Sequence, residues 1–314
     1  MLAFSVVAGA LFVLAAEPLA PQEMVLRPPQ FELARDLLER GEYDLVAQLC
    51  RRAVAMRPED PRGHVLLGAA YLALGEPGRA LLPYQRAALL DATLVEAHYG
   101  VAAAHAELAQ LAAAIEAYQR VIDLRPEHAA AHHDLGVAQS RMKRYGVAMA
   151  SFRRAIALDA AAARPHYSLG RALRERGRFD EAAASLARAL TLDPNLVDAL
   201  EVSGALHADA GRAEEAVHAF AKCVELAPDR AEAHYGLARA YVERDATALA
   251  LSAFERAIEL RPDYTEAYYG LARLHLSLGS EPEAQAAMER FELLRRTDPL
   301  LANAEPTATR LPDP

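Results

Sequence analysis

The chain has 314 residues and a formal net charge of −9, with 43 acidic and 34 basic side chains. Phosphate binding calls for a net basic domain or a basic stripe, so this composition argues against nucleic acid as a partner. Hydrophobic residues make up 53% of the sequence, yet beyond residue 16 no apolar run is long enough to cross a bilayer.

The first sixteen residues, MLAFSVVAGALFVLAA, are apolar and carry no charged side chain. As a helix this run reaches about 24 Å, which is shorter than the roughly 30 Å hydrocarbon core of a membrane. Residues 1–16 therefore predict an export signal that is cleaved after Ala15 or Ala16, and a periplasmic or secreted protein. No Lys or Arg precedes the run, so an uncleaved inner-membrane anchor is the alternative, and membrane contact is expected only through this segment. Residues 17–26 contain two prolines and are expected to form a linker.

From residue 27 onward a pattern of 34 residues repeats without a gap. Each repeat holds two stretches of helical periodicity joined by a short turn. The pattern predicts eight repeats, at residues 27–60, 61–94, 95–128, 129–162, 163–196, 197–230, 231–264 and 265–298. Residues 299–314 contain four prolines and no helical period, and are predicted to be a disordered tail.

Two positions in the second helix of every repeat carry the pattern most clearly. Repeat position 20, counted from the first residue of a repeat, holds a small residue: Val46, Ala80, Ala114, Ala148, Ala182, Ala216, Ala250 and Ala284. Repeat position 24 holds a bulkier one: Cys50, Tyr84, Tyr118, Phe152, Leu186, Phe220, Phe254 and Met288. Small residues let two helices approach closely, and large residues fill the space between them. These slots resemble the tetratricopeptide repeat (TPR).

The resemblance implies an all-α fold, a right-handed α-solenoid of eight tandem helix-turn-helix repeats. It also implies a concave groove, lined by the first helix of each repeat, that binds a protein or peptide segment. The sequence contains no Gly-rich phosphate loop, His-Glu-x-x-His pair or Gly-x-Ser-x-Gly elbow, so we expect no enzyme activity and no cofactor.

A left-handed residue is expected where each first helix ends. Glycine occupies that position in five repeats, whereas Ala109, Lys143 and Asp245 occupy it in three. A non-glycine residue in this conformation costs roughly 1 kcal/mol. Residues 95–162, which contain two of the three exceptions, are therefore the predicted soft stretch of the chain.

Cysteine and histidine could suggest metal sites, but their spacing favours packing. Cys50 and Cys223 fall in core slots of separate repeats and are predicted to be buried thiols. Histidine recurs once per repeat at position 4, in His64, His98, His132, His166 and His234. Equivalent residues on stacked helices lie about 10 to 12 Å apart, whereas zinc needs nitrogens about 2 Å away, so no metal site is expected.

The groove face of the first helices is rich in tyrosine and arginine, which protein interfaces favour. Three pairs at i, i+4 spacing are able to stack. The predicted peptide-binding residues are Tyr99, Tyr167, Arg171, Tyr235, Arg239, Tyr269 and Arg273. For Tyr99, packing against a neighbouring helix is an equally supported interpretation.

Charge along this face is expected to be segregated. Arg141, Arg164, Arg171 and Arg174 precede Asp198, Glu201 and Asp209, which predicts a positive zone followed by a negative one. The groove holds no lysine, so the grip on a terminal carboxylate that is best known in this family is not expected.

Two functions remain open at this point. The first is a non-catalytic scaffold or adaptor of the bacterial cell envelope that binds a protein partner. The alternative is a regulatory or substrate-presenting subunit of an enzyme complex, such as one containing a glycosyltransferase. In either case Phe291, which stands where other repeats have a small residue, is predicted to fold over the open end of the last repeat.

Overall fold

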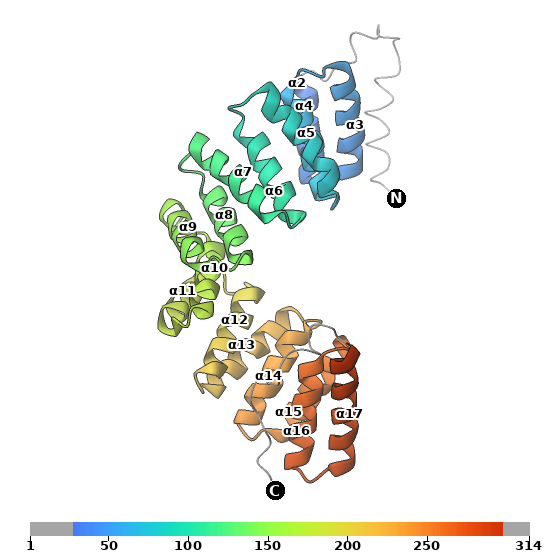
Figure 1. The fold of residues 1–314 in the computed structure, drawn as a ribbon, viewed down its shortest axis with the longest axis vertical. Helices are drawn as coiled ribbons and strands as arrows, with labels where there is room; N and C mark the ends of the chain where they lie inside the picture. Colours follow the sequence, from blue (N-terminus) through green and yellow to red (C-terminus); the bar gives the residue numbers. More distant parts are fainter. Residues whose placement is uncertain (1–27, 298–314) are drawn as a thin grey trace. The chain divides into compact units, whose positions relative to one another are not determined.

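The computed structural model describes residues 28–297, and this part of the chain folds into sixteen α-helices (Figure 1). The predicted export signal, the linker and the predicted tail lie outside the described residues. None of the helices between residues 28 and 297 combines the length and the apolar character needed to cross a membrane.

The helices alternate between first and second helices of successive hairpins. The first helices are α2 (Pro28–Glu39), α4 (Pro61–Ala73), α6 (Val95–Glu107), α8 (Ala129–Arg141), α10 (Ala163–Glu175), α12 (Val197–Asp209), α14 (Ala231–Glu243) and α16 (Thr265–Ser277). The second helices are α3 (Tyr43–Met56), α5 (Pro77–Leu90), α7 (Leu111–Leu124), α9 (Tyr145–Leu158), α11 (Phe179–Leu192), α13 (Ala213–Leu226), α15 (Thr247–Leu260) and α17 (Glu281–Thr297). From α4 onward every first helix begins at the residue where the 34-residue period places a repeat start.

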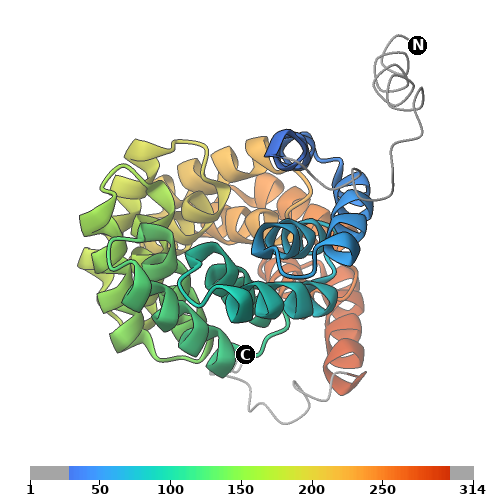
Figure 2. The same ribbon diagram turned by 90° about the horizontal axis from the view of Figure 1, so that it is seen from above.

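The chain divides into two compact units, with the boundary between Arg144 and Tyr145. Within each unit a helix packs against its neighbours in sequence, and most first helices also contact the next first helix of that unit (Figures 1 and 2). Each repeat therefore buries its apolar surface against adjacent repeats, which is the packing of an all-α solenoid. This confirms the predicted fold class.

The core includes the residues at the two repeat positions that the sequence pattern identified. The alanines at repeat position 20 are fully or almost fully buried, and the bulky residues at position 24 are buried in the first seven repeats. Cys50 and Cys223 are free and buried, as predicted. Burial raises the pKa of the Cys50 thiol to about 12 and that of Cys223 to about 11, so both stay protonated at neutral pH.

Bulky residues at position 24 insert between two first helices, where glycine makes room for them. A Cβ at Gly204 would lie 2.9 Å from the Phe220 ring, and one at Gly236 in the next repeat would lie 2.4 Å from it. Tyr84 occupies the same place between Gly68 and Gly100. Real Cβ atoms do not approach that closely, so the close helix packing at these positions requires glycine.

Histidine at repeat position 4 has a structural role that the sequence did not reveal. In His64, His98, His132 and His234 the Nε2 atom donates to a backbone carbonyl six residues earlier, at 2.9 to 3.0 Å. The accepting carbonyl belongs to the turn that closes the preceding repeat. These four histidines thus fasten α4, α6, α8 and α14 to the turns before them.

The three non-glycine helix ends are left-handed, with φ of 56° at Ala109, 59° at Lys143 and 55° at Asp245. The prediction for these three residues is therefore confirmed. Glycine takes this conformation in the other hairpin turns, for example Gly177 with φ of 70°.

Replacing Lys143 by glycine should stabilise the protein, because it removes a left-handed side chain, with a gain of up to about 1 kcal/mol. Gly177→Ala is the matched reverse change: a Cβ there meets no atom within 4 Å, so any loss comes from the backbone alone. Urea denaturation followed by circular dichroism measures both variants. A lower urea midpoint for Lys143→Gly than for the unchanged protein would contradict the prediction that a left-handed lysine costs stability.

Gly236→Ala should destabilise the protein by roughly 1 to 3 kcal/mol, because the added methyl group overlaps the Phe220 ring. Gly146→Ala in α9 is the control, since a Cβ at that helical glycine meets open space. It should not lower the midpoint. Equal losses of stability in the two variants would show that the destabilisation does not come from overlap between the added methyl group and the Phe220 ring.

Candidate functional site

The predicted site residues of the second unit lie on its first helices, α10, α12, α14 and α16. We call the surface that these four helices share the first-helix face. Tyr167 and Arg171 lie on α10, Tyr235 and Arg239 on α14, and Tyr269 and Arg273 on α16. Tyr99 lies on α6 of the first unit, so it belongs to a different compact unit from the other six predicted residues.

Each predicted pair has its guanidinium near its tyrosine ring. The Arg171 Cζ atom lies 5.6 Å from the centre of the Tyr167 ring, and its Nη1 donates to the Tyr167 hydroxyl at 3.4 Å. The Arg239 and Arg273 Cζ atoms each lie 5.9 Å from the rings of Tyr235 and Tyr269. At these distances the arginines are held over aromatic faces.

The tyrosine rings are also packing elements. Tyr235 is half-buried, with its ring centre 5.0 Å from that of Tyr264 and 6.0 Å from that of Phe254. Burial, as the largest cause, raises the pKa of Tyr167 and Tyr235, so both hydroxyls remain protonated at neutral pH. The side chains of Arg239 and Arg273 are exposed. The rings thus belong to the scaffold, while the arginines face outward.

A pocket of about 470 Å³ between α14 and α16 brings four predicted residues together: Tyr235, Arg239, Tyr269 and Arg273. It is lined as well by Val242, Glu243, Phe254, Glu266, Gly270, Leu274 and Ser277, which sequence reasoning did not select. Glu243 and Glu266 could have been found from their repeat positions, because they lie one helical turn away from the tyrosine and arginine slots.

The expected negative zone on α12 is corrected by the structure. Arg230 Nη1 donates to Asp198 and to Glu201, both at 2.9 Å, and Arg174 pairs with Asp209 at 2.7 Å. Arg230 belongs to the same repeat as Asp198 and Glu201, whereas Arg174 reaches Asp209 from the preceding repeat, and both arginines offset the local charge of α12. The segregation predicted from sequence order failed because it ignored arginines outside α12 that reach its carboxylates.

No ion pair joins Arg171, Arg239 or Arg273 to a carboxylate of residues 28–297. These guanidiniums retain donor groups that a ligand could use. On the first-helix face the cations at the predicted positions are therefore available, whereas the carboxylates of α12 are already paired.

Tyr99 is engaged within the first unit. Its hydroxyl donates to Asp134 of α8, its ring stacks on His128 with 5.2 Å between ring centres, and it meets Tyr118 edge-on at 5.7 Å. Asp134 also bonds to His133, at 2.9 Å. The packing interpretation of Tyr99 thus has direct contacts behind it. Its role in binding stays a prediction.

Metal binding finds no support in the part of the chain from residue 28 to residue 297, where no group of three His, Cys, Asp or Glu side chains is arranged to hold an ion.

Helical hairpins stacked through a shared core, with one face of paired aromatic and cationic side chains, define a helical-repeat scaffold. Profiles described as tetratricopeptide repeat match residues 31–94, 133–197, 202–264 and 242–305, and one described as TPR repeat matches residues 107–143. The chain belongs to the tetratricopeptide repeat family. None of the curated proteins matches it with significant similarity.

Solved structures similar to this chain share its fold at low sequence identity. A hetero-tetramer of Cut9 and Hcn1 from the APC/C aligns with a TM-score of 0.67 and 18% identity, over 86% of this chain and 52% of that chain. This chain thus spans about half the length of that protein. The C-terminal part of a TPR repeat-containing protein from Cytophaga hutchinsonii aligns with a TM-score of 0.55 and 18% identity, over 77% of this chain and 99% of that chain. MamA from Desulfovibrio magneticus aligns with a TM-score of 0.51 and 20% identity, over 55% of this chain and 97% of that chain.

Phe291 of α17 packs on the site, with its ring centre 5.2 Å from that of Tyr269. Phe291→Ala should lower stability by roughly 1 to 2 kcal/mol, less than for a fully buried ring, and should loosen α16. Hydrogen exchange of α16 peptides should accelerate, while α10 peptides stay protected. Leu293→Ala is the control, because Leu293 is 50% exposed and should change little. Unchanged exchange in Phe291→Ala would refute the capping role.

Proposed function

We propose that this protein is a non-catalytic adaptor whose first-helix face binds a segment of a protein partner that carries separated acidic residues. The observation behind the proposal is the set of three tyrosine-supported arginines without carboxylate partners among the described residues. Guanidinium groups bind carboxylates through two parallel hydrogen bonds. An acidic side chain of the partner would complete each pair.

Packing of the tyrosines reduces the entropic cost of such binding. Tyr235 is held by Phe254 and Tyr264, and Tyr269 by Phe291, so their rings are ordered before a partner arrives. A stacked guanidinium loses less freedom on binding than a freely rotating one. Preorganised aromatic and arginine side chains are typical interface hot spots.

Carboxylates at the pocket limit which segments fit. Glu243 and Glu266 line it beside Arg239 and Arg273, so a uniformly acidic chain would meet repulsion there. The arrangement favours acidic side chains spaced to reach the arginines, with neutral or basic residues opposite the glutamates. Recognition by alternating charge in this way gives specificity more than raw affinity.

We also propose that the protein works in the bacterial cell envelope. This part rests on the apolar, uncharged residues 1–16, and it is independent of the binding face. A pull-down from the envelope fraction with the full chain would identify the partner. Its identity would also separate an adaptor from the subunit of an enzyme complex.

The binding face is tested by changing its side chains once a partner is in hand. The triple variant Tyr167→Ala, Tyr235→Ala and Tyr269→Ala should weaken binding at least tenfold, with helical circular dichroism retained. The triple variant Arg171→Gln, Arg239→Gln and Arg273→Gln keeps the rings in place. It should weaken binding by a similar factor and reduce its salt dependence.

The matched control changes three exposed arginines of second helices: Arg153→Gln, Arg154→Gln and Arg188→Gln. Total charge falls equally, so an effect of net charge alone would appear in both triple variants. Normal binding by the folded first-helix variants, with loss in the second-helix control, would place the partner on the opposite surface and reject the proposed site.

A further inference from the structure

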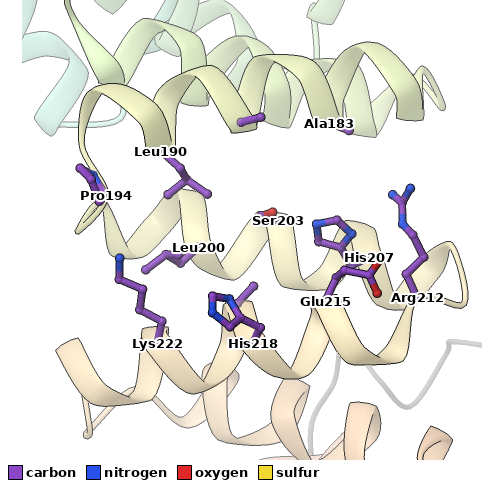
Figure 3. A pocket seen from close by; sticks show the side chains of 12 residues that line it. Ala183, Leu190, Pro194, Leu200, Ser203, His207, Arg212, Glu215, His218 and Lys222 are labelled. Carbon is purple, nitrogen blue, oxygen red and sulfur yellow. The ribbon is translucent and has the colours of Figure 1, made fainter.

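A second pocket, of about 510 Å³, lies away from the tyrosine–arginine pairs, in the groove between the second helices α11 and α13 (Figure 3). Helix α12 forms its floor with Leu200, Ser203 and His207, and α11 forms one wall with Ala183, Ala187 and Leu190. The opposite wall belongs to α13 and its N-cap. Its volume falls within the roughly 300 to 1,000 Å³ of small-molecule sites.

The pocket exists because two repeat positions carry unusually small side chains. Repeat position 7, in the first helix, is aliphatic in the seven remaining repeats: Leu33, Leu67, Val101, Leu135, Leu169, Leu237 and Leu271. In the sixth repeat it is Ser203. Repeat position 21, in the second helix, is large and apolar in five repeats, as Leu81, Ile115, Met149, Val217 and Leu251, whereas the fifth repeat has Ala183, the first has Ala47 and the eighth has Gln285. Both departures line this pocket, so space that other repeats fill is left open here.

Ser203 adds a polar group to the floor of the pocket. Its side chain is only 9% exposed, and its hydroxyl bonds to none of the residues from 28 to 297. A hydroxyl that lines a pocket can donate a hydrogen bond to a ligand or accept one from it. Figure 3 shows Ser203 between the side chains of the two walls.

Charge is unequal at the two ends of the pocket. Lys222 lies at one end beside Leu190, Leu200 and Pro194, where no carboxylate lines the pocket, and His218 is next along α13 (Figure 3). Arg212 at the other end shares its rim with Glu215. Neither Arg212 nor Lys222 has an ion-pair partner among the described residues. A ligand anion is therefore best placed at Lys222.

We propose that the pocket formed by α11, α12 and α13 binds a small amphipathic organic anion. The apolar body of the ligand lies over Leu190, Leu200 and Ala183, its anionic group pairs with Lys222, and Ser203 accepts or donates a hydrogen bond from the floor. Apolar burial supplies most of the binding and the charge fixes the orientation.

The test uses octanoate as the probe, titrated into the full chain by isothermal calorimetry. Octyl glucoside and octyltrimethylammonium are neutral and cationic counterparts whose apolar chain is one carbon longer. Octanoate should bind saturably at one site, the glucoside at least tenfold more weakly, and the cation without saturation. Failure of octanoate to saturate, or equal binding of anion and cation, would overturn the proposal.

Variants then locate the site. Ser203→Leu and Ala183→Leu each restore a residue that other repeats carry, so they fill the pocket and should abolish octanoate binding. Lys222→Gln should weaken it at least tenfold. Arg188→Gln is the matched control, because it occupies the same repeat position on α11, outside the pocket lining.

Circular dichroism melting shows whether a filled variant has folded, and the two filling positions are independent. If Ser203→Leu does not fold, Ala183→Leu alone tests the site. Octanoate binding that survives in a folded filled variant would reject the site. Because this pocket shares no lining residue with the tyrosine–arginine pocket, its failure would leave the partner-binding face untouched.

Discussion

The insertion of one bulky side chain from a second helix between two first helices is the contact on which the rest of the structure depends. Phe220 fits between Gly204 and Gly236, and Tyr84 between Gly68 and Gly100. Because a close-packed interior transmits small displacements, this contact sets the distance and rotation of neighbouring first helices. It thereby decides which side chains of α12 and α14 point into the core and which reach the first-helix face.

The first-helix face, which we propose binds a partner, is built from the same packing. Tyr235 contacts Phe254, which is itself buried at repeat position 24, and Tyr269 contacts Phe291. A ring that stabilises the stack also positions the arginine above it. Stability and recognition therefore share residues on this face, and the arginine changes isolate recognition because they leave the rings in place. Removal of the rings affects both properties, which is why each tyrosine variant has to be shown to be folded.

Periodicity in the sequence was enough to predict the helical hairpins, the first residue of each first helix from α4 onward, the buried alanines and the left-handed Ala109, Lys143 and Asp245. Those features depend on local conformation and on which residues share a repeat position. Contacts between side chains that are far apart in the sequence could not be read in the same way. Arg230 reaches Asp198 and Glu201 from 29 or more residues away, and only the structure shows that it pairs with both. The packing role of Gly236, whose lack of a side chain accommodates Phe220, also depends on such a contact.

Departures from the repeat pattern are the most informative positions once the fold is known, because the pattern accounts for what packing requires. Phe291 replaces a small residue where no further repeat was predicted, and it packs on Tyr269. Ser203 and Ala183 replace large residues in the interior of the second unit, where an unfilled space costs stability. Drift alone would be expected to scatter such losses over separate cavities. Here the two small residues come from different repeats and meet at one pocket beside Lys222, which is the arrangement that a ligand site requires.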